Sequence, residues 1–166
     1  MDDTDPTDPQ EDGSLQALGP RFLAALRSKE QGDLDTAEDE LRAILRIEPR
    51  LPEPHMELAR ILLDTDRLDE AEVHAREALQ HLETGGQWTD DLPEEAVLAL
   101  SHALLAEILR RRADEDDLIF GDPDTFEALV KESHTHFEEA ARLDPSDEYS
   151  SYYAVFLGPP GESEES

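Results

Sequence analysis

LDTAEDELRAILR, residues 34–46, returns 34 residues later as LDEAEVHAREALQ, residues 68–80. The first five positions of the two copies differ at one residue only, and Arg42 returns as Arg76 further along. Self-similarity at a fixed period of this length is the signature of a repeat architecture. The two copies therefore predict one amphipathic helix that occurs twice.

A second amphipathic stretch precedes each copy, so the repeating unit is predicted to be helix, turn, helix. Each copy opens with an acid, Asp35 or Asp69, followed three residues later by a glutamate, which predicts a capped helix start. Helices of about 12 to 15 residues are marginal alone and gain stability by stacking on neighbours. The apolar positions of the preceding stretches are Phe22, Leu23, Ala25 and Leu26 in the first unit and Met56, Leu58, Ala59, Ile61 and Leu62 in the second.

On these residues the chain resembles the tetratricopeptide repeat family, whose pattern has a small residue within the first helix, a Gly-Asp turn, an alanine opening the second helix and a terminal proline. The resemblance implies an all-α fold, a right-handed α-α superhelix of about three helix pairs plus a C-terminal capping helix. The matching slots hold Ala25, Gly32-Asp33, Ala37 and Pro49 in the first repeat, and Ala59, Asp66, Ala71 and Ala78 in the second.

A third, longer unit is predicted after the loop at residues 84–88, because residues 104–109 echo residues 57–62 at a spacing of 47. Its first helix is expected to begin near Pro93, an early helical position that suits proline. Its second helix is predicted over residues 124–143.

The chain ends in a short apolar stripe that is expected to cap the array. Its members follow the i, i+3, i+4, i+7 spacing of one helix face; they are Tyr149, Tyr152, Tyr153 and Phe156. The self-association of two chains through this stripe is the alternative.

The predicted organisation is one helical repeat domain between two polar tails. The tails carry almost no apolar residues, so they cannot offset the entropy of ordering and are predicted to be disordered. The tails cover residues 1–14 and 158–166, the domain covers residues 15–157, the repeats cover 16–49, 50–83 and 92–145, and the capping helix covers 146–157.

Acidic residues dominate the chain, with 43 Asp and Glu against 14 Lys and Arg and a net charge of −29. Such a charge repels nucleic acid and anionic membranes, so neither is expected as a partner. Salt adaptation of a whole proteome, a surface for basic proteins, and disorder are the three competing explanations. Salt adaptation is favoured, because only Lys29 and Lys131 are lysines and the acids are spread over every segment. The 37% of apolar residues, at helical spacing, argues against disorder of the whole chain.

The composition also excludes several kinds of chemistry. The chain has no cysteine, so disulfides and thiolate sites are ruled out. With neither an apolar N-terminal stretch nor a run of 18 apolar residues, a cytoplasmic protein is expected. No glycine-rich phosphate loop or nucleophile motif occurs, so we predict no enzyme and no cofactor.

The histidines and arginines that attract attention have structural explanations. Glu132 with His136, and His134 with Glu138, share a helix face but each supplies half a metal site, so no metal is predicted. The family commonly places a large packing side chain at the slots of His55 and His102, which implies burial. The run at residues 110–112 is expected to compensate the helix dipole and to pair with the acids at 114–117.

Function is inferred from the family, whose first helices line a concave groove that binds peptides. In the family's best-known binding mode, lysine, arginine and asparagine side chains hold the C-terminal carboxylate of a peptide. That set of residues is absent from the matching slots here. The predicted function is a non-enzymatic scaffold for a protein or peptide of unknown identity, and the alternative is an acidic chaperone or decoy for basic proteins. The resemblance places these residues on the groove wall: Phe22, Leu26, Lys29, Met56, Arg60, Leu63, Ala103, Glu107 and Arg110.

Overall fold

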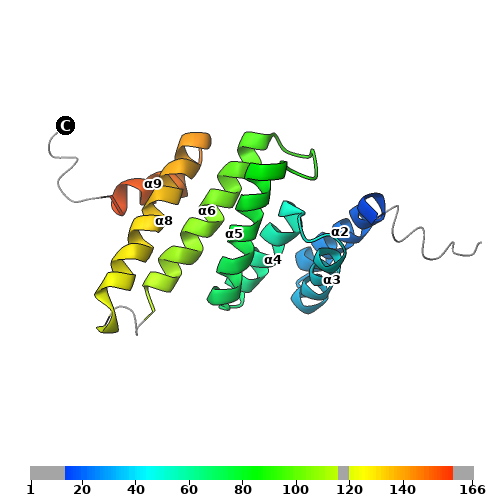
Figure 1. Ribbon diagram of the computed structural model, residues 1–166, viewed down its shortest axis with the longest axis horizontal. Helices are drawn as coiled ribbons and strands as arrows, with labels where there is room; N and C mark the ends of the chain where they lie inside the picture. Colours follow the sequence, from blue (N-terminus) through cyan, green and yellow to red (C-terminus); the bar gives the residue numbers. More distant parts are fainter. Residues whose placement is uncertain (1–13, 116–119, 159–166) are drawn as a thin grey trace, which may run out of the picture.

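The computed structural model describes residues 14–115 and 120–158, and this part of the chain folds into a row of helices without strands (Figure 1). Neighbours in the sequence are neighbours in space, because each helix packs against the next one along the chain. The predicted all-α repeat fold is therefore confirmed. The helices are α2 (Ser14–Glu30), α3 (Leu34–Ile47), α4 (Pro52–Asp64), α5 (Leu68–Gly85), α6 (Glu94–Ala113), α8 (Pro123–Leu143) and α9 (Glu148–Phe156).

The turns inside the first two helix pairs use the same backbone conformation. Gly32 has a φ of 85°, and Asp66, in the equivalent slot 34 residues later, has a φ of 63°. Left-handed backbone is easiest for glycine and tolerable for aspartate, so Asp66 can replace the glycine of the family's turn. In both repeats the backbone therefore reverses direction within three residues.

The predicted helix caps are wrong by two residues. Asp35 and Asp69 lie in the first turns of α3 and α5, where acids face the positive end of the helix dipole. The N-cap of α3 is Asp33, whose side chain accepts a hydrogen bond from the Thr36 amide at 3.2 Å. The N-cap of α5 is Arg67, which makes no side-chain cap.

Small residues lie where the helices cross. Ala25 and Ala59 are 1% and 0% exposed within α2 and α4, and Ala106 occupies the same buried position in α6. Ser133 lies against Ala106 and donates its hydroxyl hydrogen to the Ala106 carbonyl at 2.8 Å. Helix axes can approach closely at these positions because no large side chain separates the backbones.

The third helix pair is longer than the second. Helices α6 and α8 have 20 and 21 residues, whereas α4 and α5 have 13 and 18. Register is nonetheless preserved: α5 buries Ala71, Ala75 and Ala78, and α8 buries Ser133, Phe137 and Ala140 at the same mutual spacing. The added length of α8 thus precedes the part that pairs like a normal repeat.

Helix α9 turns only part of its aromatic stripe toward the row. The Tyr153 ring stacks on the fully buried Phe137 ring with centroids 5.2 Å apart. Tyr152 and Phe156, by contrast, are 58% and 63% exposed. The predicted tails at residues 1–14 and 158–166 fall almost wholly outside the described residues, apart from Ser14, which begins α2, and Gly158.

Charged side chains join successive repeats on the side of the second helices. Glu38 accepts hydrogen bonds from Arg42 on its own helix and from Arg67 of the next repeat, at 2.7 and 2.6 Å. The arrangement recurs 34 residues later, where Glu72 accepts from Arg76 at 2.8 Å and from Arg112 at 2.6 Å. Repetition of the sequence therefore repeats an ionic contact as well as a packing contact.

Candidate protein-binding surface

An apolar cavity of about 150 Å³ opens between the first helices of the three pairs. Phe22 and Leu26 come from α2, Met56 from α4, and Val97 and Leu100 from α6. Leu92, from the loop before α6, and the acids Glu53, Glu57 and Asp91 complete the wall. Three residues of the predicted groove, Phe22, Leu26 and Met56, therefore meet at one place.

The loop between α5 and α6 shapes one side of this cavity. The Glu53 carboxylate, buried near the start of α4, accepts hydrogen bonds from the Trp88 and Thr89 amides at 3.0 Å each. The Thr89 hydroxyl also donates to Glu53 at 3.0 Å. The Trp88 ring then packs on Phe22 with centroids 5.4 Å apart. The loop is thus held onto α2 and α4 by one carboxylate and one aromatic contact.

The signals for this loop in the sequence are indirect. Glu83 stands where the family has its terminal proline, and Gly86 follows with a φ of 83°. Those two features predict that α5 runs on and then breaks. The closure of the loop by Glu53 joins residues 35 positions apart, which no local pattern can indicate.

Other predicted groove residues lie around the cavity without lining it. Lys29 donates to Glu57 across α2 and α4 at 2.7 Å, so its charge is already paired. Leu63 is buried, with 7% of its surface exposed. Arg60 and Ala103 are half-buried on α4 and α6.

The far end of the predicted groove is partly covered by α9. The Arg110 guanidinium binds Glu107 at 2.8 Å and Asp114 at 3.2 Å, and it lies 4.9 Å from the centre of the Tyr153 ring. The Tyr149 hydroxyl donates to Glu107 at 2.7 Å. Burial favours a higher pKa for Glu107, but the hydrogen bonds from Arg110 and Tyr149 outweigh it, so the pKa lies below its usual value. The burial of Tyr149 and its hydrogen bond to Glu107 raise the pKa of the Tyr149 hydroxyl to about 12.

Comparison with known proteins gives one result for the first two repeats. Residues 29–81 match the family model described as tetratricopeptide repeat. This segment belongs to the tetratricopeptide repeat family. No curated protein gives a significant match to the chain. Tetratricopeptide repeats generally mediate protein interactions, which supports a protein-interaction scaffold as the coarse functional class.

The tetratricopeptide match covers the end of α2, all of α3 and α4, and most of α5. Helices α6, α8 and α9 lie outside the matched segment. Their relation to the repeats is inferred from their packing and from the spacing of buried residues that α8 shares with α5. In the part of the chain that the structure describes, no helix is long and apolar enough to span a bilayer.

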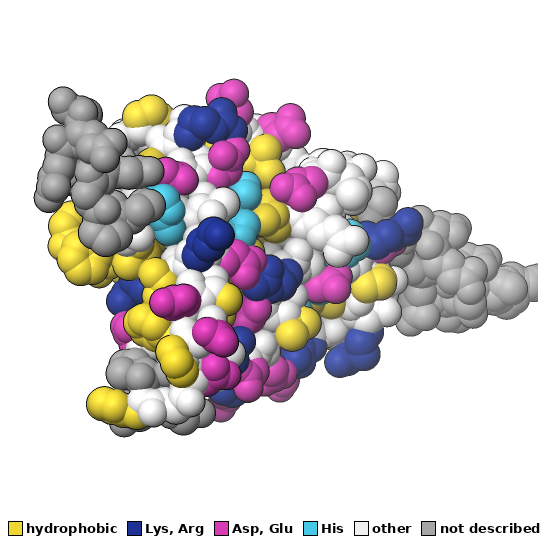
Figure 2. Space-filling model, turned by 60° about the vertical axis from the view of Figure 1, so that its left-hand side comes forward, with side chains coloured by type: hydrophobic (Ala, Val, Ile, Leu, Met, Phe, Trp, Pro, Cys, Tyr) yellow, Lys and Arg dark blue, Asp and Glu magenta, His cyan; other side chains and the backbone are white. Residues whose placement is uncertain are grey.

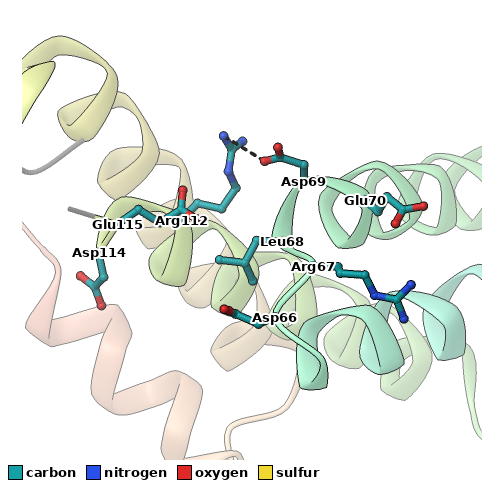
Figure 3. A pocket seen from close by; sticks show the side chains of 8 residues that line it. All are labelled: Asp66, Arg67, Leu68, Asp69, Glu70, Arg112, Asp114 and Glu115. Atoms are coloured by element: carbon teal, nitrogen blue, oxygen red, sulfur yellow. Dashed lines mark ion pairs between the residues drawn. The ribbon is translucent and has the colours of Figure 1, made fainter. Parts of the chain in front are cut away.

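A second, larger hollow lies beside the turn of the second tetratricopeptide repeat, where it meets the end of α6 (Figure 3). Arg112 reaches across it toward Asp69, with which it forms an ion pair at 3.3 Å. Arg67, also in its wall, already binds Glu38. Because both arginines are paired and the other charged wall residues are acids, this hollow offers a mainly anionic surface in which Leu68 is the apolar wall residue; the acids are Asp66, Asp69, Glu70, Asp114 and Glu115.

The sequence predicted only some of the partners of two groups of side chains. They are the arginine run at residues 110–112 of α6 and the pairs of histidine and glutamate on α8. Arg110 binds Asp114 as expected, and among the described residues Arg112 binds Asp69 and Glu72 of α5 rather than Asp114 or Glu115. Asp116 and Asp117 lie outside the described residues. Glu132 contacts His136 at 3.5 Å, yet its shortest contact, 2.7 Å, is to Arg76 of α5.

Proposed function

We propose that the protein is a non-enzymatic scaffold that binds a segment of another protein across α2, α4 and α6. The observation that carries this proposal is the apolar cavity between those helices. A cavity of about 150 Å³ is large enough for a benzene-sized group. One aliphatic or aromatic side chain of the partner is therefore the natural anchor.

Charge around the cavity favours basic residues beside that anchor. Asp91 and Glu57 lie in its wall, where Glu57 also pairs with Lys29, and the chain as a whole carries a net charge of −29. A strongly negative surface attracts cationic segments and repels acidic ones. The proposed partner segment thus carries one large apolar residue flanked by lysine or arginine.

The proposed contact set keeps the groove residues predicted from the family and gives them different weights. Phe22, Leu26 and Met56 supply the apolar contact. Arg60 extends the surface along α4, and Lys29, paired with Glu57, extends it along α2, whereas Leu63 is buried. Ala103, Glu107 and Arg110 extend it along α6 to the point where α9 begins to cover it.

Two exposed leucines at the cavity mouth allow a test that spares the core. Leu92 and Leu100 are 45% and 43% exposed, so Leu92→Asp with Leu100→Glu should leave folding intact while placing charge at the anchor site. Leu23→Glu is the matched control, because Leu23 is equally exposed on α2 but does not line the cavity. Proteins captured from native extract by the wild type should be lost with the double variant and kept with the control. Equal capture by all three would refute the proposal.

A second candidate function rests on the charge alone. An acidic chaperone or decoy would bind basic proteins through its general surface, motivated by the net charge of −29. At 1 M salt the Debye length is about 3 Å, so such binding should vanish, whereas cavity-anchored binding should persist. Capture that disappears in salt and ignores the leucine variants would favour the decoy.

Four finer expectations from the sequence stay predictions within this proposal. Self-association through Tyr149, Tyr152, Tyr153 and Phe156 would appear as a concentration-dependent mass in sedimentation. It is supported by the exposure of Tyr149, Tyr152 and Phe156, whereas Tyr153 is half-buried. Exclusion of nucleic acid follows from the charge and is tested by a gel-shift assay. The cytoplasmic location is tested by fractionation, and adaptation to high salt by the salt dependence of folding.

A further inference from the structure

A cluster of histidines joins the two helices of the second repeat, away from the cavity. His55 comes from α4, and His74, Glu77 and His81 come from α5. The α5 members are spaced by three and four residues, so they share one face of the helix. The His55 ring lies between the other two imidazoles, with centroids 5.2 Å from His74 and 5.8 Å from His81.

Three of these side chains can point ligand atoms at one place. One ligating atom each from His55, Glu77 and His81 lies within 4.8 Å of the others. Nε2 of His81 is already 3.1 Å from a Glu77 carboxylate oxygen. In a tetrahedral zinc site with bonds of about 2.0–2.1 Å, ligand atoms are about 3.4 Å apart. Closing the remaining gap requires a shift of at most about 1.4 Å, and the Glu77 side chain, 45% exposed, has room to adjust.

We propose that His55, Glu77 and His81 form a binding site for a divalent transition-metal ion of the zinc type. Two imidazoles and one carboxylate are a donor set that suits zinc, copper or nickel better than magnesium or calcium. Three protein ligands leave the fourth position to water. The strongly negative chain raises the local concentration of any dication.

The surroundings of His55 support a ligand role for one of its ring nitrogens. Nε2 lies 2.7 Å from the Pro49 carbonyl oxygen, and Nδ1 lies 3.0 Å from Nδ1 of His74. Because a carbonyl oxygen only accepts, Nε2 carries the hydrogen, and the ion would bind Nδ1 in place of the contact with His74. Metal-bound histidines almost always donate their second N–H to such a partner, which fixes the orientation of the ring.

The third repeat provides an internal comparison. His102 and His136 form the same kind of pair, with Nδ1 atoms 2.9 Å apart and centroids 5.1 Å apart. In the shared register of α5 and α8, His136 matches His74, and Leu143 stands where α5 has His81. Among the described residues, only the second repeat gathers three such ligands. The presence of His81, rather than the histidine pair itself, therefore distinguishes the proposed site.

The test is zinc binding to the full-length protein after removal of any affinity tag and dialysis against a chelator. Isothermal titration with Zn²⁺ should be run in 0.5 M NaCl with excess Mg²⁺, so that exposed carboxylates are screened and occupied. We expect one saturable site in the wild type. His81→Leu, which copies the third repeat, and Glu77→Ala should each weaken zinc binding at least about tenfold.

His134→Leu is the matched control, because His134 pairs with Glu138 on α8 and lies outside the cluster. It should bind zinc like the wild type. Circular dichroism of each variant shows whether the fold is retained, and Glu77→Ala keeps the test valid if His81→Leu unfolds. Zinc binding that is equal in the wild type and both cluster variants, or that has no defined stoichiometry, would overturn the proposal.

Discussion

Acid should weaken the fold through the histidine pair of the third repeat. His102 is 9% exposed, and its Nδ1 faces Nδ1 of His136 at 2.9 Å, so one shared hydrogen satisfies both neutral rings. Burial and the neighbouring His136 lower the pKa of His102 to about 4. Glu139 opposes that shift and Arg142 reinforces it. Burial also lowers the pKa of His136, against the opposing pull of Glu132.

The direction of the pH effect on stability follows from comparing proton binding in the folded and unfolded states. An unfolded histidine has a pKa near 6.5, so between pH 6.5 and 4 the unfolded chain binds the extra proton and the folded chain does not. The stabilising contribution is complete above pH 6.5 and is lost progressively as the pH falls toward 4. For His102 alone, the change from pH 7.5 to pH 5 amounts to about 2 kcal/mol of unfolding free energy.

Urea denaturation followed by circular dichroism measures this loss at both pH values. In His102→Gln, the difference between pH 7.5 and pH 5 should shrink by about 2 kcal/mol, because the titrating buried group is gone. Comparing the variant with the wild type cancels the carboxylates and the histidines of the second repeat. His134→Gln is the control and should keep the wild-type difference. An unchanged pH dependence in His102→Gln would refute the reasoning.

Three further predictions concern the repeat scaffold. Ala59→Leu should lower the unfolding free energy in urea by about 2 kcal/mol, because α4 has no space for a larger side chain at a position that is 0% exposed. Asp66→Gly should raise the thermal midpoint slightly, with a gain of about 0.5 kcal/mol, because glycine adopts the φ of 63° at lower cost. Glu38→Gln should cost about 1 kcal/mol, since the contacting Arg67 and Arg42 are partly exposed and screened by solvent. Hydrogen bonds from Arg67 and Arg42 lower the pKa of Glu38 to about 2, so the effect should be full above about pH 4.5 and fade as the pH falls toward 2, as acid titration of both proteins would show.

The helical repeat was predictable because its determinants are local and periodic. The return of LDTAE as LDEAE, and the pairing of Ala25 with Ala59 at the same interval, specify both the helices and the positions where they cross. The caps were less predictable, because Asp33 and Asp35 are both reasonable N-cap residues and only the turn geometry selects Asp33.

The candidate surfaces depend on contacts that the repeat pattern does not encode. Phe22, Leu26 and Met56 could be assigned to one face from their repeat slots. The loop that completes their cavity is held by Glu53, a residue that reads in the sequence as an ordinary helix-start acid. In the same way, the spacing of Glu77 and His81 on one helix face can be seen in the sequence, but their approach to His55 follows only from the packing of α4 against α5.

The distribution of the few basic residues bears on how a partner is chosen. Several arginines join helices: Arg67 binds Glu38 of the preceding repeat, Arg76 binds Glu132 of α8, and Arg112 binds Glu72 of α5. Figure 2 shows acidic side chains spread over the face that carries α8 and α9, among basic and hydrophobic side chains. Because these arginines neutralise acids inside the array, the unpaired acids determine the field that an approaching protein meets.

Such a field acts over distance, whereas the apolar cavity acts only on contact. Long-range attraction between an acidic scaffold and a basic segment speeds association and is screened by salt, while a desolvated apolar anchor governs dissociation. For the wild type, added salt should therefore lower the association rate far more than it raises the dissociation rate. For the Leu92→Asp, Leu100→Glu variant the dissociation rate should rise instead, which separates the two contributions within one experiment.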